Sequence, residues 1–115
     1  FKNKVKLIRR DSNIGYAKNF INGLSESDSH YDYYAYSDQD DIWNEDKIER
    51  ALLKLDKQDN NSNLLYCSST IVFDNDSKKV IGKSIIFNKE KCFKNALVQN
   101  FAGGNTMVFN KSSRD

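Results

Sequence analysis

The sequence predicts an α/β fold in which a mostly parallel sheet is flanked by helices. Two observations lead to this prediction. Apolar residues alternate between the short runs typical of strands and the spacing typical of helices, in the order strand, helix, strand, helix, strand. The 115 residues, 38% hydrophobic and 30% charged, suffice for one compact core but are too few for two ordinary domains. We therefore expect residues 1–115 to form a single domain.

The first half of the chain has the clearest patterns. Residues 4–10 (KVKLIRR) predict a short strand, and residues 11–15 (DSNIG) predict a turn. Residues 16–24 carry apolar side chains at helical spacing and predict a helix. The tyrosine-rich residues 31–37 predict a buried central strand, and residues 44–57 predict a second helix.

The second half is more irregular. After a polar loop, residues 64–73 (LLYCSSTIVF) predict a third strand, and residues 74–79 predict a turn. The remaining patterns predict a short strand at residues 85–87, a helix at 89–99 and a final strand at 106–109, entered through Gly103 and Gly104.

Composition excludes several classes of protein. Lys and Arg number 18 against 16 for Asp and Glu, and a formal charge of +2 gives no argument for a nucleic-acid partner. No apolar run approaches the roughly 20 residues that span a bilayer. Cys67 and Cys92 lack the spacing of a metal site, which indicates reduced, largely buried thiols in a cytoplasmic protein. His30 lies in a polar stretch and is interpreted as a surface residue.

Three aspartates directly follow the tyrosine-rich strand, in the stretch YAYSDQDDIW. Asp38, Asp40 and Asp41 suit a solvated turn or a helix cap. They also suit a metal site, because Mg²⁺ and Mn²⁺ prefer oxygen ligands and are held by one or two carboxylates plus substrate phosphates. In a parallel sheet, ligands bind beyond the carboxyl ends of the strands, which is where this stretch falls.

Two other kinds of site also use closely spaced aspartates. A calcium loop counted from Asp38 is excluded, because Ile42 occupies a ligand position and Trp43 the position that requires glycine. An aspartyl-phosphate phosphotransferase also uses two aspartates after a strand, but there the motif lies on the first strand. Here a strand and a helix are predicted before it, so this reading is the weaker alternative.

Three motifs together resemble the family 2 glycosyltransferases of the GT-A (Rossmann-like) fold, especially the bacterial rhamnosyltransferase-like branch. They are SDQDDIW followed by DKIERAL, the upstream NIGYAKNFINGL and the downstream NFAGGNTMVFNK. Their order matches the family over nearly the whole chain. The resemblance implies transfer of a sugar, in that branch rhamnose, from a nucleotide-diphosphate donor to a surface-polysaccharide, glycan or lipid-linked glycan acceptor.

The resemblance also implies roles for individual residues. Asp40 would bind Mg²⁺ or Mn²⁺ at the donor diphosphate, and Asp38 would contact the ribose or the ion. The residues expected near the nucleotide are Asn13, Gly15, Lys18 and Asn19. Those expected at the sugar or acceptor are Asp41, Trp43, Gly103, Gly104, Asn105 and Thr106. Structural interpretations are equally good for Trp43 as an anchor for the next helix, for Lys18 as a solvated helix lysine, and for residues 103–106 as an ordinary strand entry.

The chain also departs from the family pattern. The family's first strand and helix, and a second strand with an acidic motif for the nucleotide base and ribose, are expected before residue 1. The catalytic base of the inverting reaction is expected downstream of Asp115. We therefore expect residues 1–115 to be the central part of a longer catalytic domain and to be inactive alone. The parent protein is expected in the cytoplasm, at the inner face of the membrane. A non-catalytic nucleotide- or metal-binding module is the alternative from another class.

Overall fold

Three short strands form the main sheet, in the order β1 (Tyr33–Ala35), β5 (Val108–Asn110) and β2 (Leu65–Tyr66). The structure is a computed structural model that describes residues 4–85, 92, 94–95, 100 and 102–115. Its other elements are α1 (Tyr16–Ser25), α2 (Lys47–Leu55), β3 (Ile71–Asp74), β4 (Lys79–Lys83), the 3-10 turn η1 (Gly104–Thr106) and α4 (Lys111–Arg114).

Strand direction differs from the prediction. β1 and β2 each pair with β5 in antiparallel register, with Tyr34 opposite Phe109 and Tyr66 opposite Val108. β1 and β2 therefore run in the same direction, but β5 lies between them and runs the opposite way. The predicted mostly parallel sheet is not found among the described strands, because a strand from the end of the chain inserts between two earlier ones. The prediction of helices alternating with strands is confirmed from α1 to β2, without the strand that was predicted before α1.

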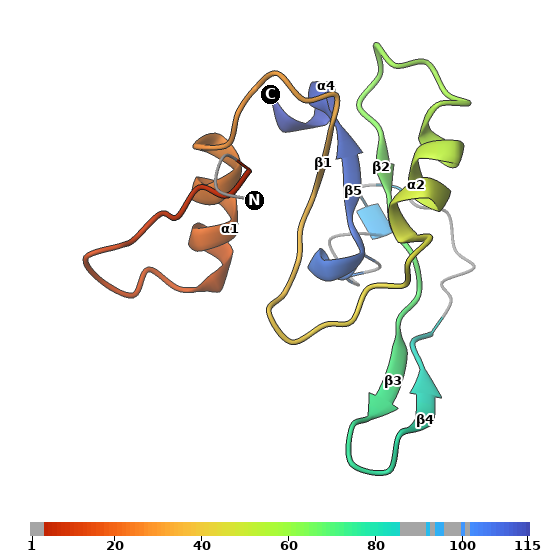
Figure 1. Cartoon of the computed structure of the whole chain (residues 1–115). Helices are drawn as coiled ribbons and strands as arrows, with labels where there is room; N and C mark the ends of the chain where they lie inside the picture. Colours follow the sequence, from red (N-terminus) through yellow and green to blue (C-terminus); the bar gives the residue numbers. More distant parts are fainter. Residues whose placement is uncertain (1–3, 86–91, 93, 96–99, 101) are drawn as a thin grey trace.

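The core lies between α2 and this sheet (Figure 1). Ala51 and Leu55, one turn apart on α2, pack against Val108, which is 1% exposed. Phe109, on the same strand, lies 6.1 Å from Tyr34 and 5.4 Å from Tyr36 between ring centroids. The helix predicted at residues 44–57 is confirmed with shorter bounds, and its apolar stripe explains why it covers the sheet.

The first elements are only partly as predicted. The helix predicted at residues 16–24 is confirmed as α1, which buries none of its residues. The strand predicted at residues 4–10 is wrong, since this segment has no strand pairing and Leu7 is 79% exposed. Instead, Arg10 forms an ion pair with Glu26 at 2.5 Å. β1 lies at an edge of the sheet rather than in its buried centre, because among the described strands β5 is its sole partner.

The predicted strand at residues 64–73 is two strands. Only β2 joins the main sheet, whereas β3 pairs with β4 in a separate hairpin that projects away from it (Figure 1). The predicted turn is confirmed between β3 and β4, where the Asp74 carboxylate accepts a hydrogen bond from the Ser77 backbone N–H. The predicted strand at residues 85–87 and helix at 89–99 lie largely outside the described residues.

Asn110, the last residue of β5, links the end of the sheet to the loop before β2 and to α4. Its side chain, in a residue only 4% exposed, accepts from the Leu64 backbone N–H at 3.0 Å and donates to the Ser62 carbonyl at 2.8 Å. It also caps α4 by accepting from the Ser113 N–H. The final predicted strand is confirmed as β5, which begins two residues later and ends one residue later than predicted.

Three smaller predictions can be compared with the structure. His30 is confirmed as a surface residue, with its side chain 88% exposed beside Asp28. Cys67 and Cys92 form no disulfide, and both are half-buried rather than largely buried. Within the described ranges, no helix is long and apolar enough to cross a membrane.

Candidate functional site

The acidic loop, residues 37–46, leaves the carboxyl end of β1 and leads into α2, as Figure 1 shows in yellow. Asp38 is half-buried, and Asp40 and Asp41 are exposed around a turn at residues 39–40. None of the hydrogen bonds found among the described residues uses the carboxylates of Asp38 and Asp40. These two groups therefore remain available to a ligand.

The glycine segment, Gly103–Thr106, forms a tight turn that feeds β5. The Thr106 hydroxyl donates to the Gly103 carbonyl at 2.8 Å, and the Thr106 backbone N–H donates to the same oxygen at 2.9 Å. Thr106 is only 4% exposed. A Cβ added at Gly103 would lie 3.0 Å from the Asn105 side-chain oxygen, so any other residue there would require the Asn105 side chain to shift by a few tenths of an ångström. The turn is thus fixed by its own hydrogen bonds and by the strand that follows.

The acidic loop and the glycine segment meet directly. The Asn105 side-chain amide donates to the Asp41 carboxylate at 2.5 Å, although the two residues are 64 positions apart. The Lys47 ammonium, at the start of α2, donates to the Asn105 backbone carbonyl at 2.6 Å. Two motifs predicted to share a sugar pocket therefore lie side by side.

Lys47 also covers one face of the Trp43 ring, with its ammonium 3.3 Å from the ring centroid. Burial lowers the pKa of Lys47, and the nearby Asp41 carboxylate partly opposes that shift. Trp43 is half-buried, and its indole N–H is shielded from solvent without a hydrogen-bond partner among the described residues. A sugar ring at Trp43 would have to use another part of the indole.

Lys47 was not among the residues predicted from sequence. The available signal was its spacing, because Trp43 and Lys47 lie four positions apart and a helical or near-helical turn brings such residues together. Its contact with Asn105 joins residues 58 positions apart and has no signal in a single sequence.

The predicted nucleotide-side residues lie on and before α1. The Asn13 side chain accepts from the Gly15 backbone N–H at 2.9 Å, and Gly15 has a φ of 79° that favours glycine. Lys18 and Asn19 are exposed on the first turns of α1. In the described part of the chain, no hydrogen bond or ion pair joins these four residues to the acidic loop. The two regions are linked instead by Phe20, whose ring packs 5.2 Å from that of Tyr36.

The donor set at Asp38 and Asp40 fits a hard divalent cation. Both are carboxylates, the ligand type that Mg²⁺ and Mn²⁺ prefer. Among the described residues, no group of three or more His, Cys, Asp and Glu side chains is placed to hold a metal ion. A cation bound here would therefore take its remaining ligands from water and substrate phosphates.

An open pocket of about 420 Å³ lies at the opposite end of β1. Its lining includes Asp32, Tyr33, Asp56 and Asn110, and none of the predicted site residues. The Tyr33 hydroxyl donates to the Asp56 carboxylate at 2.5 Å. That hydrogen bond is the main cause of the raised pKa of Tyr33. The pocket is thus separate from the acidic loop.

Comparison with known proteins identifies the family. The family model described as glycosyl transferase family 2 matches residues 1–115. No curated protein and no solved structure matches the chain significantly. The match covers the acidic loop, the glycine segment and α1 together. The chain belongs to glycosyl transferase family 2.

Proposed function

We propose that the chain provides the donor-sugar part of an inverting transferase that uses a nucleotide-diphosphate sugar and a divalent cation. The contact between Asp41 and Asn105 carries this proposal, because it joins the acidic loop to the glycine segment at one place. Family membership supports glycosyl transfer in general. The donor and acceptor assignments below are our proposal.

Each group of residues has a distinct task in this proposal. Asp38 and Asp40 hold Mg²⁺ or Mn²⁺, which when bound neutralises the charge of the departing nucleoside diphosphate. Asn13, Gly15, Lys18 and Asn19 bind the nucleotide side of the donor, and Asp41 and Asn105 orient the sugar. The acceptor hydroxyl loses its proton to a base and attacks the anomeric carbon, while the bond to the diphosphate breaks.

The finer assignments rest on the motif SDQDDIW. We propose a deoxyhexose such as rhamnose as the donor sugar, and a glycan or lipid-linked glycan of the cell surface as the acceptor. An acceptor of that kind would bring the protein to the inner face of the membrane.

Calorimetric titration of the 115-residue chain with Mn²⁺ and a panel of nucleoside diphosphates tests the proposal. We expect metal-dependent binding that Asp40→Ala weakens at least about tenfold, or ~1.4 kcal/mol, because an anionic ligand to the cation is lost. The control is Asp76→Ala, which removes the same charge from the exposed turn between β3 and β4. Equal affinities in wild type and Asp40→Ala would rule out the metal role of Asp40.

A further inference from the structure

We infer that Lys47 is a positioning residue for the sugar side of the site: its ammonium holds Trp43 and the Asn105 main chain, and Asn105 in turn orients the Asp41 carboxylate. This inference rests on the proposed function for its consequence in donor binding. The contacts themselves involve only residues of this chain.

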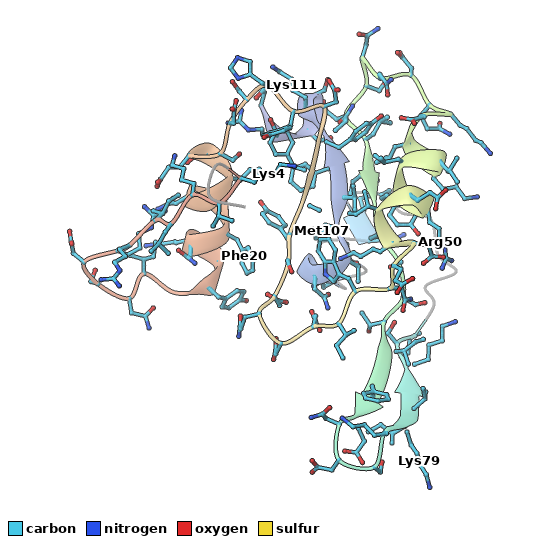
Figure 2. All side chains as sticks on the ribbon, in the orientation of Figure 1. Lys4, Phe20, Arg50, Lys79, Met107 and Lys111 are labelled. Carbon is cyan, nitrogen blue, oxygen red and sulfur yellow. The ribbon has the colours of Figure 1, made fainter. Side chains whose placement is uncertain are left out.

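Three consecutive contacts make up this arrangement. The Lys47 ammonium lies 3.3 Å from the Trp43 ring centroid and donates to the Asn105 carbonyl at 2.6 Å. The Asn105 amide then donates to Asp41 at 2.5 Å. Asn105 is therefore held at its main chain by a cation and at its side chain by an anion. Figure 2 labels Met107, which follows η1, and Arg50 of α2; the contact between Lys47 and Asn105 joins these two elements.

The position of Lys47 is set by the core. It is the first residue of α2, and Ala51, one turn later, is fully buried against Val108. On the other side of the contact, Asn105 lies three residues before Val108 in the chain. The Lys47 ammonium and the Asn105 carbonyl are thus attached to opposite sides of the same core cluster. The distance between them is fixed by packing rather than by the loop alone.

A lysine suits this position for a physical reason. A compact ammonium has three donors and no acceptor, so it can donate to a carbonyl while facing an aromatic ring. The charged group that faces it from the acidic loop is Asp41, which partly offsets the lowering of the Lys47 pKa by burial. Removing the cation would remove the side-chain contact to the Asn105 carbonyl and leave the exposed link to Asp41 as the remaining side-chain contact described for Asn105.

The expected consequence is selective. Asp38 and Asp40 have no described contact with Lys47, so binding of the cation and the diphosphate should not depend on it. Asp41 is the carboxylate reached through Asn105, and it is proposed to contact the sugar. Loss of Lys47 should therefore lower affinity for the nucleotide sugar but not for the free nucleoside diphosphate.

The first measurement needs no ligand. Trp43 is the single tryptophan of the chain, so its emission reports directly on the ammonium over its ring. We expect Lys47→Met to change the emission maximum and intensity, and Lys47→Arg to restore part of the wild-type signal. Lys54→Met, an exposed lysine at the other end of α2, is the matched control and should leave the emission unchanged. An unchanged spectrum in Lys47→Met would overturn the inference.

The second measurement compares affinities in the presence of Mn²⁺. For each variant, the affinity for a deoxyhexose-carrying nucleoside diphosphate is divided by that for the free diphosphate. We expect Lys47→Met to lower this ratio about tenfold with Lys47→Arg intermediate, a change that general destabilisation would not produce. Asn105→Ala, which removes the amide link alone, should lower it as well and serves if Lys47→Met fails to fold.

The two proposals fail in different ways. If the wild-type chain binds no nucleoside diphosphate with Mn²⁺, the proposed function is overturned, and the Trp43 emission still decides whether Lys47 holds the indole. If wild type binds both ligands and neither Lys47→Met nor Asn105→Ala changes the ratio, the positioning role is overturned while the proposed function stands.

Discussion

Replacing Asn110 with alanine removes five hydrogen bonds at the junction of β5, α4 and the loop before β2. The Asn110 side-chain oxygen accepts from the Leu64 N–H, the Ser113 N–H and the Ser113 hydroxyl, at 3.0, 3.2 and 2.9 Å. Its amide donates to the Asn60 and Ser62 carbonyls, at 3.2 and 2.8 Å. The carbonyls belong to exposed residues and would regain water as a partner.

The expected cost follows from the groups that would not regain a partner. Loss of a helix cap typically costs about 1 kcal/mol, and an unsatisfied, partly buried N–H such as that of Leu64 costs about 1–3 kcal/mol. We therefore expect Asn110→Ala to lower the free energy of unfolding by about 2–4 kcal/mol. Asn110→Asp keeps the acceptors but loses both donations, and its cost should be intermediate.

Urea unfolding followed by circular dichroism measures this cost. The control is Asn61→Ala, an exposed asparagine in the same loop whose side chain has no hydrogen bond among the described residues. An Asn110→Ala variant within about 0.5 kcal/mol of Asn61→Ala, at an unchanged denaturant slope, would refute the view that this side chain fastens the end of the sheet.

Two further predictions concern single positions. Gly15→Ala should destabilise the folded chain by about 1 kcal/mol, because a φ of 79° strains any other residue. Gly23→Ala, inside α1, should stabilise it by about 0.5–1 kcal/mol. Urea unfolding of both variants checks that the two effects have opposite signs. The Trp43 emission should titrate with a midpoint below 10.5, the ordinary pKa of lysine, because burial lowers the pKa of Lys47. Between that lowered pKa and 10.5, the Lys47 side chain binds more protons in the unfolded chain than in the folded one. The Lys47 contribution to the free energy of unfolding therefore rises with pH in this range. If the free energy of unfolding of wild type and of Lys47→Met depended on pH in the same way, this prediction would be contradicted.

Sequence patterns succeeded where structure is local. α1, α2 and the turn between β3 and β4 were predictable, because helical spacing and turn residues act over a few positions. Strand direction was not, since strands of two to five residues carry no signal of which partner they meet. The segment at residues 4–10 has strand-like composition but finds no strand partner among the described residues. Composition alone cannot distinguish a segment that pairs as a strand from one that does not.

The candidate site, like the fold, could be predicted from the sequence only where the pattern is local. Asp38, Asp40 and Asp41 were recognisable as candidate ligands because of their chemistry and their place after a strand. The link between Asp41 and Asn105 could be expected only from the order of family motifs. Lys47 and Asn110 were missed, because a lysine at a helix start and an asparagine at a strand end are common surface residues. Only long-range contacts, of 46 to 58 positions, reveal their roles.

The two sides of the proposed donor site are attached to the protein very differently. α2 and β5 each contribute buried residues to the core, so the junction of Lys47, Asn105 and Asp41 is built on packed elements. α1 buries none of its residues, and the described link from it to the end of β1 is the contact between Phe20 and Tyr36. A site arranged in this way is preorganised where the sugar would lie and loosely held where the nucleotide would lie. Since ordering a loosely held element costs free energy on binding, the nucleotide must supply that cost through its own contacts. Changes on the α1 side should therefore act mainly on donor affinity, whereas changes at the Lys47 junction should act on discrimination between donors.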